Sequence, residues 1–202
     1  PKFIELGDSL LDGVGATSEE TSFGFLLYKY LDPAGEMDLI NLAVSGAVVN
    51  DVLVRQLPRA LQENPKSVVL LIGTNNVHDG TSLSEFEKDY REIIDQLTSK
   101  TSAKITLITI PYLGSDKILL PPWNAYIDLK TRQYNKVIEK MANEKNLELI
   151  DLYHLTRDKF TKTSDLYSPD QFHPSDKGYR LWVDLIKQSL RSDDLKESRD
   201  AN

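Results

Sequence analysis

The sequence predicts an α/β fold in which helices cover both faces of a parallel sheet. Five short apolar segments have the length and composition of buried parallel strands. These segments are Phe3–Leu6, Asp38–Leu42, Ser67–Ile72, Ile105–Ile110 and Leu147–Leu152. Stretches with helical spacing separate them, and this alternation is typical of a sheet whose strands are joined by right-handed helical crossovers.

Amphipathic helices are predicted where apolar residues recur every three or four positions. One lies within Phe25–Leu31, a second within Val49–Leu61 and a third within Leu83–Leu97, where Ser82 and Glu85 have the spacing of a capping box. Val137, Ile138, Met141 and Ala142 mark a fourth helix. The last helix carries Tyr179, Trp182, Leu185, Ile186 and Leu190, with Ser175 as its expected N-cap.

Length and composition favour one globular domain. The 202 residues are enough to bury a hydrophobic core, and we expect residues 1–190 to form a single domain with a polar, frayed tail at 191–202. A net charge of −7 argues against nucleic acid as the main partner, because phosphate binding needs a basic surface. No apolar run reaches the roughly 18 to 20 residues that span a bilayer, so no stable membrane insertion is expected. The oligomeric state cannot be predicted.

The chain has no cysteine, which excludes disulfides, thiolate metal sites and cysteine nucleophiles. At the N-terminus, Pro1–Leu6 leads directly into the first predicted strand without the features of a signal peptide. We therefore expect a cytoplasmic protein. A secreted or periplasmic protein whose leader has been removed is the alternative.

Four short segments lie where ligands bind in open parallel sheets, beyond the carboxyl ends of the predicted strands. Gly7-Asp8-Ser9-Leu10 follows the first strand, Gly46 comes after the second, and Gly73-Thr74-Asn75-Asn76 follows the third. Asp170-Gln171-Phe172-His173-Pro174 precedes the last helix. If the strand order is 2-1-3-4-5, the first strand lies between the second and the third. Ser9 would then lie between Gly46 and Asn75.

Such a site can carry out acyl transfer. A serine hydroxyl becomes a nucleophile when a positioned base takes its proton, and His173 can be that base. Asp170, three residues earlier, can accept the Nδ1 proton and stabilise the imidazolium. The backbone N–H groups of Ser9 and Gly46 and the amide of Asn75 are the candidate donors to an oxyanion.

These four blocks, in this order, resemble those of the GDSL/SGNH hydrolase superfamily, which includes lysophospholipases, thioesterases and arylesterases. The resemblance runs from residue 3 to about residue 186. It implies a flavodoxin-like three-layer α/β/α sandwich, the SGNH hydrolase fold, and catalytic roles for Ser9, Asp170 and His173 with Gly46 and Asn75 in the oxyanion hole. One departure is Asn76, where many members have aspartate; this puts only local hydrogen bonding in doubt.

A substrate pocket is harder to predict. The segment Tyr112–Trp123 is apolar for a loop, and it either packs on the core or lines a pocket beside Ser9. The weaker candidates for substrate contact are Asp8, Thr74, His78, Tyr112, Leu113, Leu120, Trp123 and Phe172. His154 is expected to be structural or exposed.

The predicted function is hydrolysis of short to medium acyl esters through an acyl-enzyme on Ser9, without cofactor or metal. Lysophospholipids and thioesters are further possible substrates. A carbohydrate O-acetyl esterase on the same scaffold is an alternative. Two alternatives come from other functional classes. A non-catalytic ligand-binding module of this fold would need a nucleotide-binding fingerprint, which this sequence lacks. A Mg²⁺-dependent phosphatase using Asp8 and Asp12 would need the usual D-x-D spacing, which these two residues do not have. A pseudo-enzyme that binds acylated partners has no support, because every catalytic position is filled.

Overall fold

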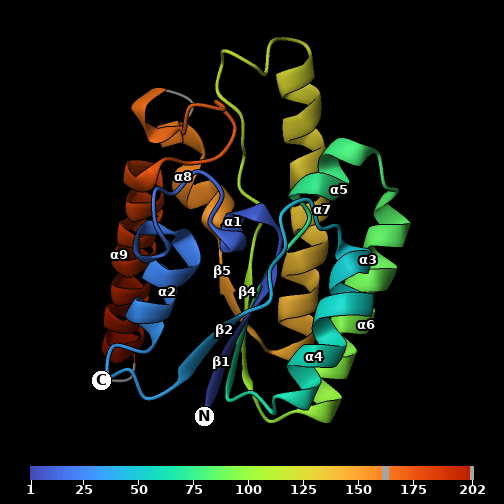
Figure 1. Cartoon of the computed structure of the whole chain (residues 1–202), viewed down its shortest axis with the longest axis vertical. Coiled ribbons are helices and arrows are strands. Elements are labelled where there is room, and N and C mark those ends of the chain that lie inside the picture. Colours follow the sequence, from blue (N-terminus) through green and yellow to red (C-terminus); the bar gives the residue numbers. More distant parts are fainter. Residues whose placement is uncertain (161–163, 201–202) are drawn as a thin grey trace.

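A five-stranded parallel sheet forms the centre of the computed structural model, which describes residues 1–160 and 164–200 (Figure 1). The strands are β1 (Lys2–Gly7), β2 (Asp38–Asn41), β3 (Ser67–Leu71), β4 (Lys104–Ile108) and β5 (Glu148–Ile150). Their order is β2-β1-β3-β4-β5, and all neighbouring strands pair in parallel. The predicted strand order is confirmed.

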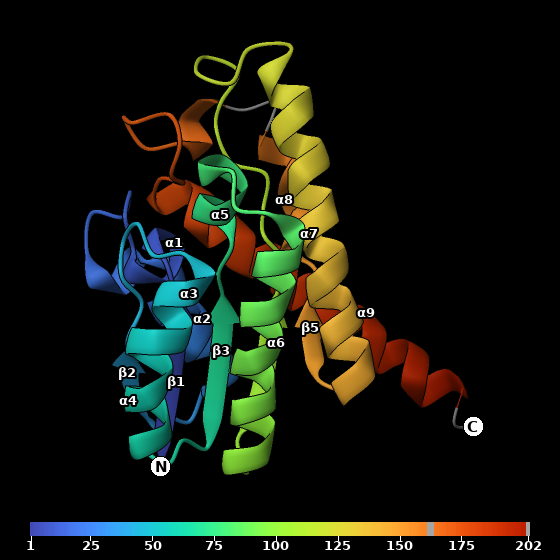
Figure 2. The same ribbon diagram turned by 90° about the vertical axis from the view of Figure 1, so that its right-hand side faces the viewer.

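Helices cover both faces of this sheet. They are α1 (Ser9–Asp12), α2 (Phe23–Leu31), α3 (Val49–Asp51), α4 (Leu57–Gln62), α5 (Thr74–Asp79), α6 (Leu83–Lys100), α7 (Trp123–Lys145), α8 (Leu152–Phe160) and α9 (Asp176–Asp200). Figures 1 and 2 show α2, α8 and α9 on one side of the sheet and α3, α4, α6 and α7 on the other. This is the three-layer α/β/α arrangement that we expected. None of the helices in the described part of the chain is long and apolar enough to cross a membrane.

Alternation along β1 supplies both layers of the core. Ile4 and Leu6 belong to the hydrophobic cluster that includes residues of α6 and α7. Phe3 belongs to the cluster under α2 and α9. Because side chains of a strand point alternately to opposite faces, a strand covered on both sides is mostly apolar. This explains the apolar run Val68–Leu71 in β3 and the apolar residues of β1 on either side of the buried Glu5.

Capping residues begin two of the predicted helices where the sequence placed them. The Ser82 hydroxyl accepts from the Glu85 backbone at 3.3 Å, and the Glu85 carboxylate accepts from the Ser82 backbone at 3.2 Å. The Ser175 hydroxyl accepts from Gly178 N at 3.2 Å, at the start of α9. Each bond satisfies a backbone donor that the first turn of a helix leaves without a partner.

The helical segment predicted within 49–61 contains a widened, π-helical turn at Val52–Gln56, between α3 and α4. Pro58 explains the irregularity. Proline lacks the N–H that an α-helix would direct at the carbonyl of Val54, and its ring clashes with that carbonyl. A wider turn relieves the clash and keeps the segment helical.

Several helical features were missed. The helices α5 and α8 were not predicted, and α8 begins at Leu152, so the fifth predicted strand ran too far. The helix α7 begins at Trp123, well before the apolar marks at Val137–Ala142. Its first turns expose Tyr126 and Leu129, so they lack the apolar face by which a helix is recognised in a sequence.

At the C-terminus, the frayed tail expected at 191–202 stays a prediction. The backbone of α9 continues as a helix to Asp200, and residues 201–202 lie outside the described part. The segment contains Leu195, Lys196 and Glu197, which have high intrinsic helix propensity.

Candidate active site

Ser9 begins the short helix α1 directly after β1, at the carboxyl edge of the sheet (Figure 1). The Asp8 carboxylate caps α1 by accepting from Leu10 N at 3.1 Å. Gly13 ends the helix in the left-handed region, with φ of 90°. This strand-turn-helix connection leaves the Ser9 side chain at the carboxyl edge of the sheet and its backbone N–H at a helix N-terminus, where donors are free.

A continuous series of hydrogen-bond distances links Ser9, His173 and Asp170. The Ser9 hydroxyl lies 2.9 Å from Nε2 of His173, and Nδ1 of His173 lies 2.6 Å from Oδ2 of Asp170. In this geometry the imidazole can take the hydroxyl proton at Nε2 while the carboxylate accepts the proton on Nδ1. Such an arrangement can activate a serine as a nucleophile.

Asp170 is held as a carboxylate by several donors. Its Oδ1 accepts from Ser168 Oγ at 2.8 Å, from Phe172 N at 2.8 Å and from His173 N at 2.9 Å. Desolvation of the carboxyl raises its pKa, but the hydrogen bonds from His173 and from these donors outweigh it and lower the pKa to about 2. The low pKa favours the carboxylate form of Asp170 at neutral pH, and its Oδ2 can accept the proton of Nδ1 of His173.

The turn that carries His173 is packed against the loop after α1. A Cβ placed on Gly15, whose φ is +94°, would lie 2.2 Å from the carbonyl oxygen of Pro174 and 3.1 Å from the Cβ of His173. Only glycine permits both this conformation and this approach. At the start of α9, Asp176 accepts from Thr17 N at 2.8 Å and holds the same loop in place.

Asn75 is hydrogen-bonded to the turn that contains Gly46, and the place of both beside Ser9 stays a prediction. Gly46 has φ of +82° in a turn closed by a hydrogen bond from Ala47 N to Val44 O at 3.0 Å. This φ is the one required at the third position of a type II turn, which explains the glycine. Asn75 donates through Nδ2 to Ala47 O at 2.9 Å, so its amide is tied to the same turn and keeps its second N–H.

Asn76, the departure from the family pattern, has a clear local task. It is 1 % exposed, accepts from Val49 N at 2.9 Å through Oδ1, and donates through Nδ2 to Thr81 Oγ1 at 3.1 Å. An amide can accept and donate at once, so both partners are satisfied. Asparagine at position 76 is thus bonded to Val49 and Thr81 and does not occupy the second N–H of Asn75.

Of the expected pocket residues, Phe172 contacts His173 and His78 contacts Phe172. The ring of Phe172 is 5.0 Å from that of His173 and 5.4 Å from that of His78, in edge-to-face geometry. Asp8 and Thr74 are almost fully buried, as is Ser9 itself, and a contact of either with substrate stays a prediction. Burial raises the pKa of Asp8 to about 7.

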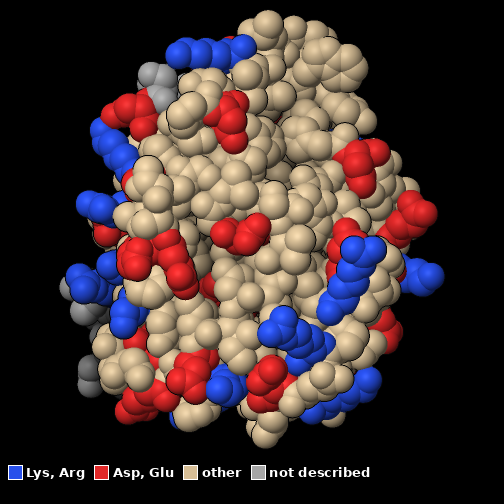
Figure 3. Space-filling model, in the orientation of Figure 1, with Lys and Arg blue, Asp and Glu red and all other residues tan. Residues whose placement is uncertain are grey.

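The loop before α7 divides into a buried and an exposed part, so neither alternative considered for Tyr112–Trp123 holds for the whole. Tyr112 and Leu113 are buried, and Leu113 joins the core under α2 and α9. Leu120 and Trp123 are 58 % and 66 % exposed. The top of the face in Figure 3, where the view of Figure 1 shows the loop before α7, is mostly uncharged. The loop reaches the catalytic turn through Ser115 N, which donates to Gln171 O at 2.8 Å.

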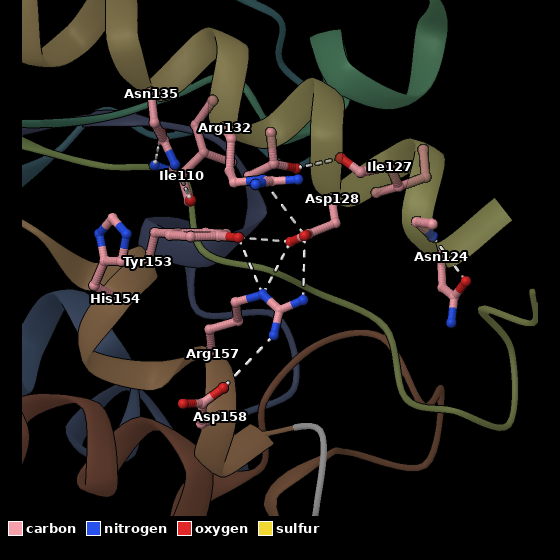
Figure 4. A network of polar contacts seen from close by, with 12 residues as sticks. Ile110, Asn124, Ile127, Asp128, Arg132, Asn135, Tyr153, His154, Arg157 and Asp158 are labelled. Atoms are coloured by element: carbon pink, nitrogen blue, oxygen red, sulfur yellow. Dashed lines mark hydrogen bonds and ion pairs between the residues drawn. The ribbon is translucent and has the colours of Figure 1, made fainter. Parts of the chain in front are cut away.

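A second polar cluster joins α7 to α8 (Figure 4). Asp128 accepts from the Tyr153 hydroxyl at 2.6 Å and from Nε and Nη2 of Arg157, both at 3.1 Å. Burial alone would raise the pKa of Asp128, but its hydrogen bonds with Arg157 and Tyr153 bring the pKa below the usual value. The cluster faces an open pocket of about 260 Å³ beside Tyr112. Because its charges pair with one another, we assign it to packing of the two helices.

His154 repeats part of the catalytic geometry without a serine. Its Nδ1 lies 2.7 Å from Oδ2 of Asp151, three residues earlier, and its side chain is 69 % exposed. This agrees with the expectation of an exposed histidine. An Asp-x-x-His pair is therefore common to both places, and the hydroxyl of Ser9 distinguishes the candidate site.

Gln56 was missed by the sequence reasoning. Its buried amide forms two hydrogen bonds with the backbone of Gly7, two residues before Ser9. The available signal was a polar residue on the apolar face of a predicted helix, four positions after Val52. Buried polar side chains need partners, so such a residue points to a specific contact.

The profile of the GDSL-like lipase/acylhydrolase family matches residues 6–181 of this chain. The chain belongs to this family. An acetylxylan esterase of Geobacillus stearothermophilus is 25 % identical over 89 % of this chain and 89 % of its own length. A GDSL-like esterase of Mycobacterium tuberculosis is 25 % identical over 96 % of this chain, which spans 62 % of that protein.

Solved structures agree on the fold. A lipase/acylhydrolase from Enterococcus faecalis has a TM-score of 0.73 and 26 % identity, with 95 % of each chain covered. The psychrotrophic esterase EstA from Pseudoalteromonas sp., in a structure inhibited by monoethylphosphonate, has a TM-score of 0.73 and 22 % identity and covers 95 % of this chain and 97 % of its own. The predicted SGNH hydrolase fold is thus confirmed, and family membership supports ester hydrolysis as the activity.

Proposed function

We propose that this protein is a serine ester hydrolase in which Ser9, His173 and Asp170 form the catalytic triad. The observation that carries the proposal is the 2.9 Å distance between the Ser9 hydroxyl and Nε2 of His173, with Asp170 bound to the opposite ring nitrogen. Ser9 Oγ attacks the ester carbonyl as its proton passes to His173. The protonated imidazole then gives that proton to the leaving alcohol, and an acyl-enzyme remains on Ser9.

Deacylation follows the same path in reverse. A water molecule gives its proton to His173 and attacks the acyl carbon, and Ser9 recovers a proton as the acid leaves. In both steps the negative oxygen of the tetrahedral intermediate is bound by the N–H groups of Ser9 and Gly46 and by the free N–H of Asn75. Donors held in place before the reaction stabilise developing charge without reorganisation.

Short to medium carboxylic esters are the proposed substrates. A specific second candidate is the acetate ester of a carbohydrate, because one relative, alignable over 89 % of this chain, is an acetylxylan esterase. The phosphatase alternative needs Asp8 as nucleophile, and the complete burial of Asp8 argues against it. The cytoplasmic location stays a prediction.

Hydrolysis of p-nitrophenyl acetate, butyrate and octanoate, measured beside release of acetate from an acetylated xylo-oligosaccharide, tests both candidates. We expect Ser9→Ala and His173→Ala to abolish turnover on whichever substrate the wild type prefers, with unchanged circular dichroism. His154→Ala is the matched control, because it removes a histidine with the same aspartate partnership. Turnover near the wild-type rate in Ser9→Ala would reject the proposal.

A further inference from the structure

The side-chain amide of Gln56 pairs at two points with the backbone of Gly7. Gly7 N donates to Oε1 of Gln56 at 2.9 Å, and Nε2 of Gln56 donates to Gly7 O at 2.8 Å. Gln56 is 4 % exposed, so water does not compete for these groups. Two bonds from one planar amide fix the orientation of the backbone as well as its position.

Gln56 completes the sheet at the point where β2 has ended. The last register pair between the two strands is Glu5 with Asn41, followed by a hydrogen bond from Leu42 N to Glu5 O at 2.9 Å. The chain then turns toward Gly46 and supplies Val44 N, which donates to Gly7 O at 3.2 Å. The acceptor for Gly7 N comes from Gln56. Its amide thus stands where the backbone of a longer β2 would lie.

On its other side, Gly7 is pressed against β3. A Cβ on Gly7 would lie 2.3 Å from the carbonyl oxygen of Leu71. The backbone just before Asp8 and Ser9 is therefore confined between β3 and Gln56. A shift of that backbone must move the turn that carries Ser9.

The π-helical turn Val52–Gln56 delivers the amide to this place. Turns of this kind are often found at functional sites. Val54, two residues earlier in the same turn, is 55 % exposed. The turn therefore directs Val54 to solvent and Gln56 to β1, the strand that precedes Ser9. The local irregularity thus has a consequence for the site.

We propose that Gln56 is a positioning residue for the reaction. By fixing Gly7, it keeps the hydroxyl of Ser9 in line with His173 and the Ser9 N–H directed at the oxyanion. The inference rests on the proposed function of Ser9 as the nucleophile. Misplacement of a reacting atom by about 1 Å can lower a rate by about two orders of magnitude, so a lost constraint here should be measurable.

Gln56→Met tests the inference, since it keeps the length of the side chain and removes both hydrogen bonds. We expect a folded protein whose kcat on p-nitrophenyl acetate falls at least about tenfold while KM stays within about threefold. The rate at which a p-nitrophenyl phosphonate labels Ser9 should fall in parallel. Val54→Ala, in the same turn and without contact to Gly7, is the control and should match the wild type in all three measurements.

Wild-type kcat and labelling rate in folded Gln56→Met would overturn the inference. If Gln56→Met does not fold, Gln56→Glu, which keeps an acceptor for Gly7 N, and Gln56→Asn, which is too short to reach, are measured in its place. Loss of kcat at constant KM in either one supports a positioning role. Failure of all three to fold would assign Gln56 to stability alone and reject the inference.

Ser9→Ala, measured in the same series, separates the two claims. An active Ser9→Ala variant refutes the proposed function. An inactive Ser9→Ala variant together with a fully active Gln56→Met variant refutes only the positioning role.

Discussion

The imidazole of His173 reaches the hydroxyl of Ser9 across 164 positions of sequence, with Nε2 and Oγ 2.9 Å apart. The contact exists because β1, in the middle of the sheet, ends at Gly7, two residues before Ser9, and the turn before α9 folds over the same edge. Gly15 and Asp176 join the loop after α1 to that turn. The alignment of the two catalytic atoms therefore depends on a few identifiable contacts, each of which can be tested.

Gly15→Ala should disturb His173 directly. The new Cβ would meet the carbonyl oxygen of Pro174 at 2.2 Å and the Cβ of His173 at 3.1 Å, so the turn must move. We expect kcat to fall at least about tenfold. Gly35→Ala is the control, because Gly35 also has positive φ but no atom within 4 Å of its Cβ. Both variants should lose about 1 kcal/mol of stability from backbone strain; equal activity in the two would contradict the account.

Asp170→Asn should lower kcat by three to four orders of magnitude (~10³ to 10⁴). The neutral amide does not stabilise the imidazolium of His173, and it does not hold the imidazole in the tautomer that carries its proton on Nδ1. The pKa of Asp170 is lowered to about 2, so in the wild type this carboxylate stays ionised at every pH above about 4. The pH profile of kcat/KM should accordingly show no limb that belongs to Asp170 between pH 4 and 9. Asp151→Asn, which alters the His154 pair, should leave kcat unchanged; a comparable loss there would point to a general effect on stability.

Asn75→Ala should lower kcat by about 10²- to 10³-fold with little change in KM, as expected for a donor that binds the transition state more strongly than the substrate. The exposed Asn50, whose amide donates to Asp89, is a suitable control position. Steady-state kinetics on one ester for Asn75→Ala and Asn50→Ala decide the point. A rise in KM alone would place Asn75 in substrate binding.

Glu5 should make the protein less stable as pH rises. It is fully buried on β1, a Cβ on Gly24 would lie 2.5 Å from its Oε2, and burial, with repulsion from Glu19, raises its pKa to about 8. The unfolded chain loses this proton near pH 4.5 and the folded protein keeps it, so the free energy of unfolding falls between pH 4.5 and 8, by a few kcal/mol (roughly 1.4 per pKa unit). Asp8, with a pKa of about 7, contributes in the same direction.

Urea unfolding at pH 5 and pH 8 measures this effect. In Glu5→Gln the difference between the two midpoints should be clearly smaller than in the wild type, and the Asp8 contribution should remain. Substitution of the exposed Glu36 by glutamine should leave the difference as it is. An identical pH dependence in Glu5→Gln and the wild type would show that Glu5 is ionised in the folded protein.

The strand order and the contacts among Ser9, His173 and Asp170 could be predicted because each depends on a local signal. Buried strands show as apolar runs, and the residues that follow parallel strands must meet at one edge. Ser82 and Ser175 were recognisable as caps for the same reason, since a cap is defined by residues within one turn.

Features set by distant contacts could not be predicted. The pairing of Gln56 with Gly7 depends on where β2 ends relative to β1, and the burial of Thr74 and Tyr112 depends on how loops pack. The exposed turns of α7 around Tyr126 have no apolar periodicity by which to place the start of the helix. In each case the packing of distant parts of the chain decides which contact or degree of burial a residue has, and the neighbouring sequence does not distinguish the alternatives.

Covalent labelling of Ser9 is the most direct test of the central claim. The wild type is incubated with an ethyl p-nitrophenyl phosphonate, and the digested protein is examined by mass spectrometry. The account predicts one phosphonyl group per chain, located in the peptide that contains Gly7-Asp8-Ser9-Leu10, with loss of esterase activity in step with labelling. Both should be absent in Ser9→Ala and strongly slowed in His173→Ala. Labelling at another residue, or full inhibition without modification of Ser9, would contradict the assignment of the nucleophile.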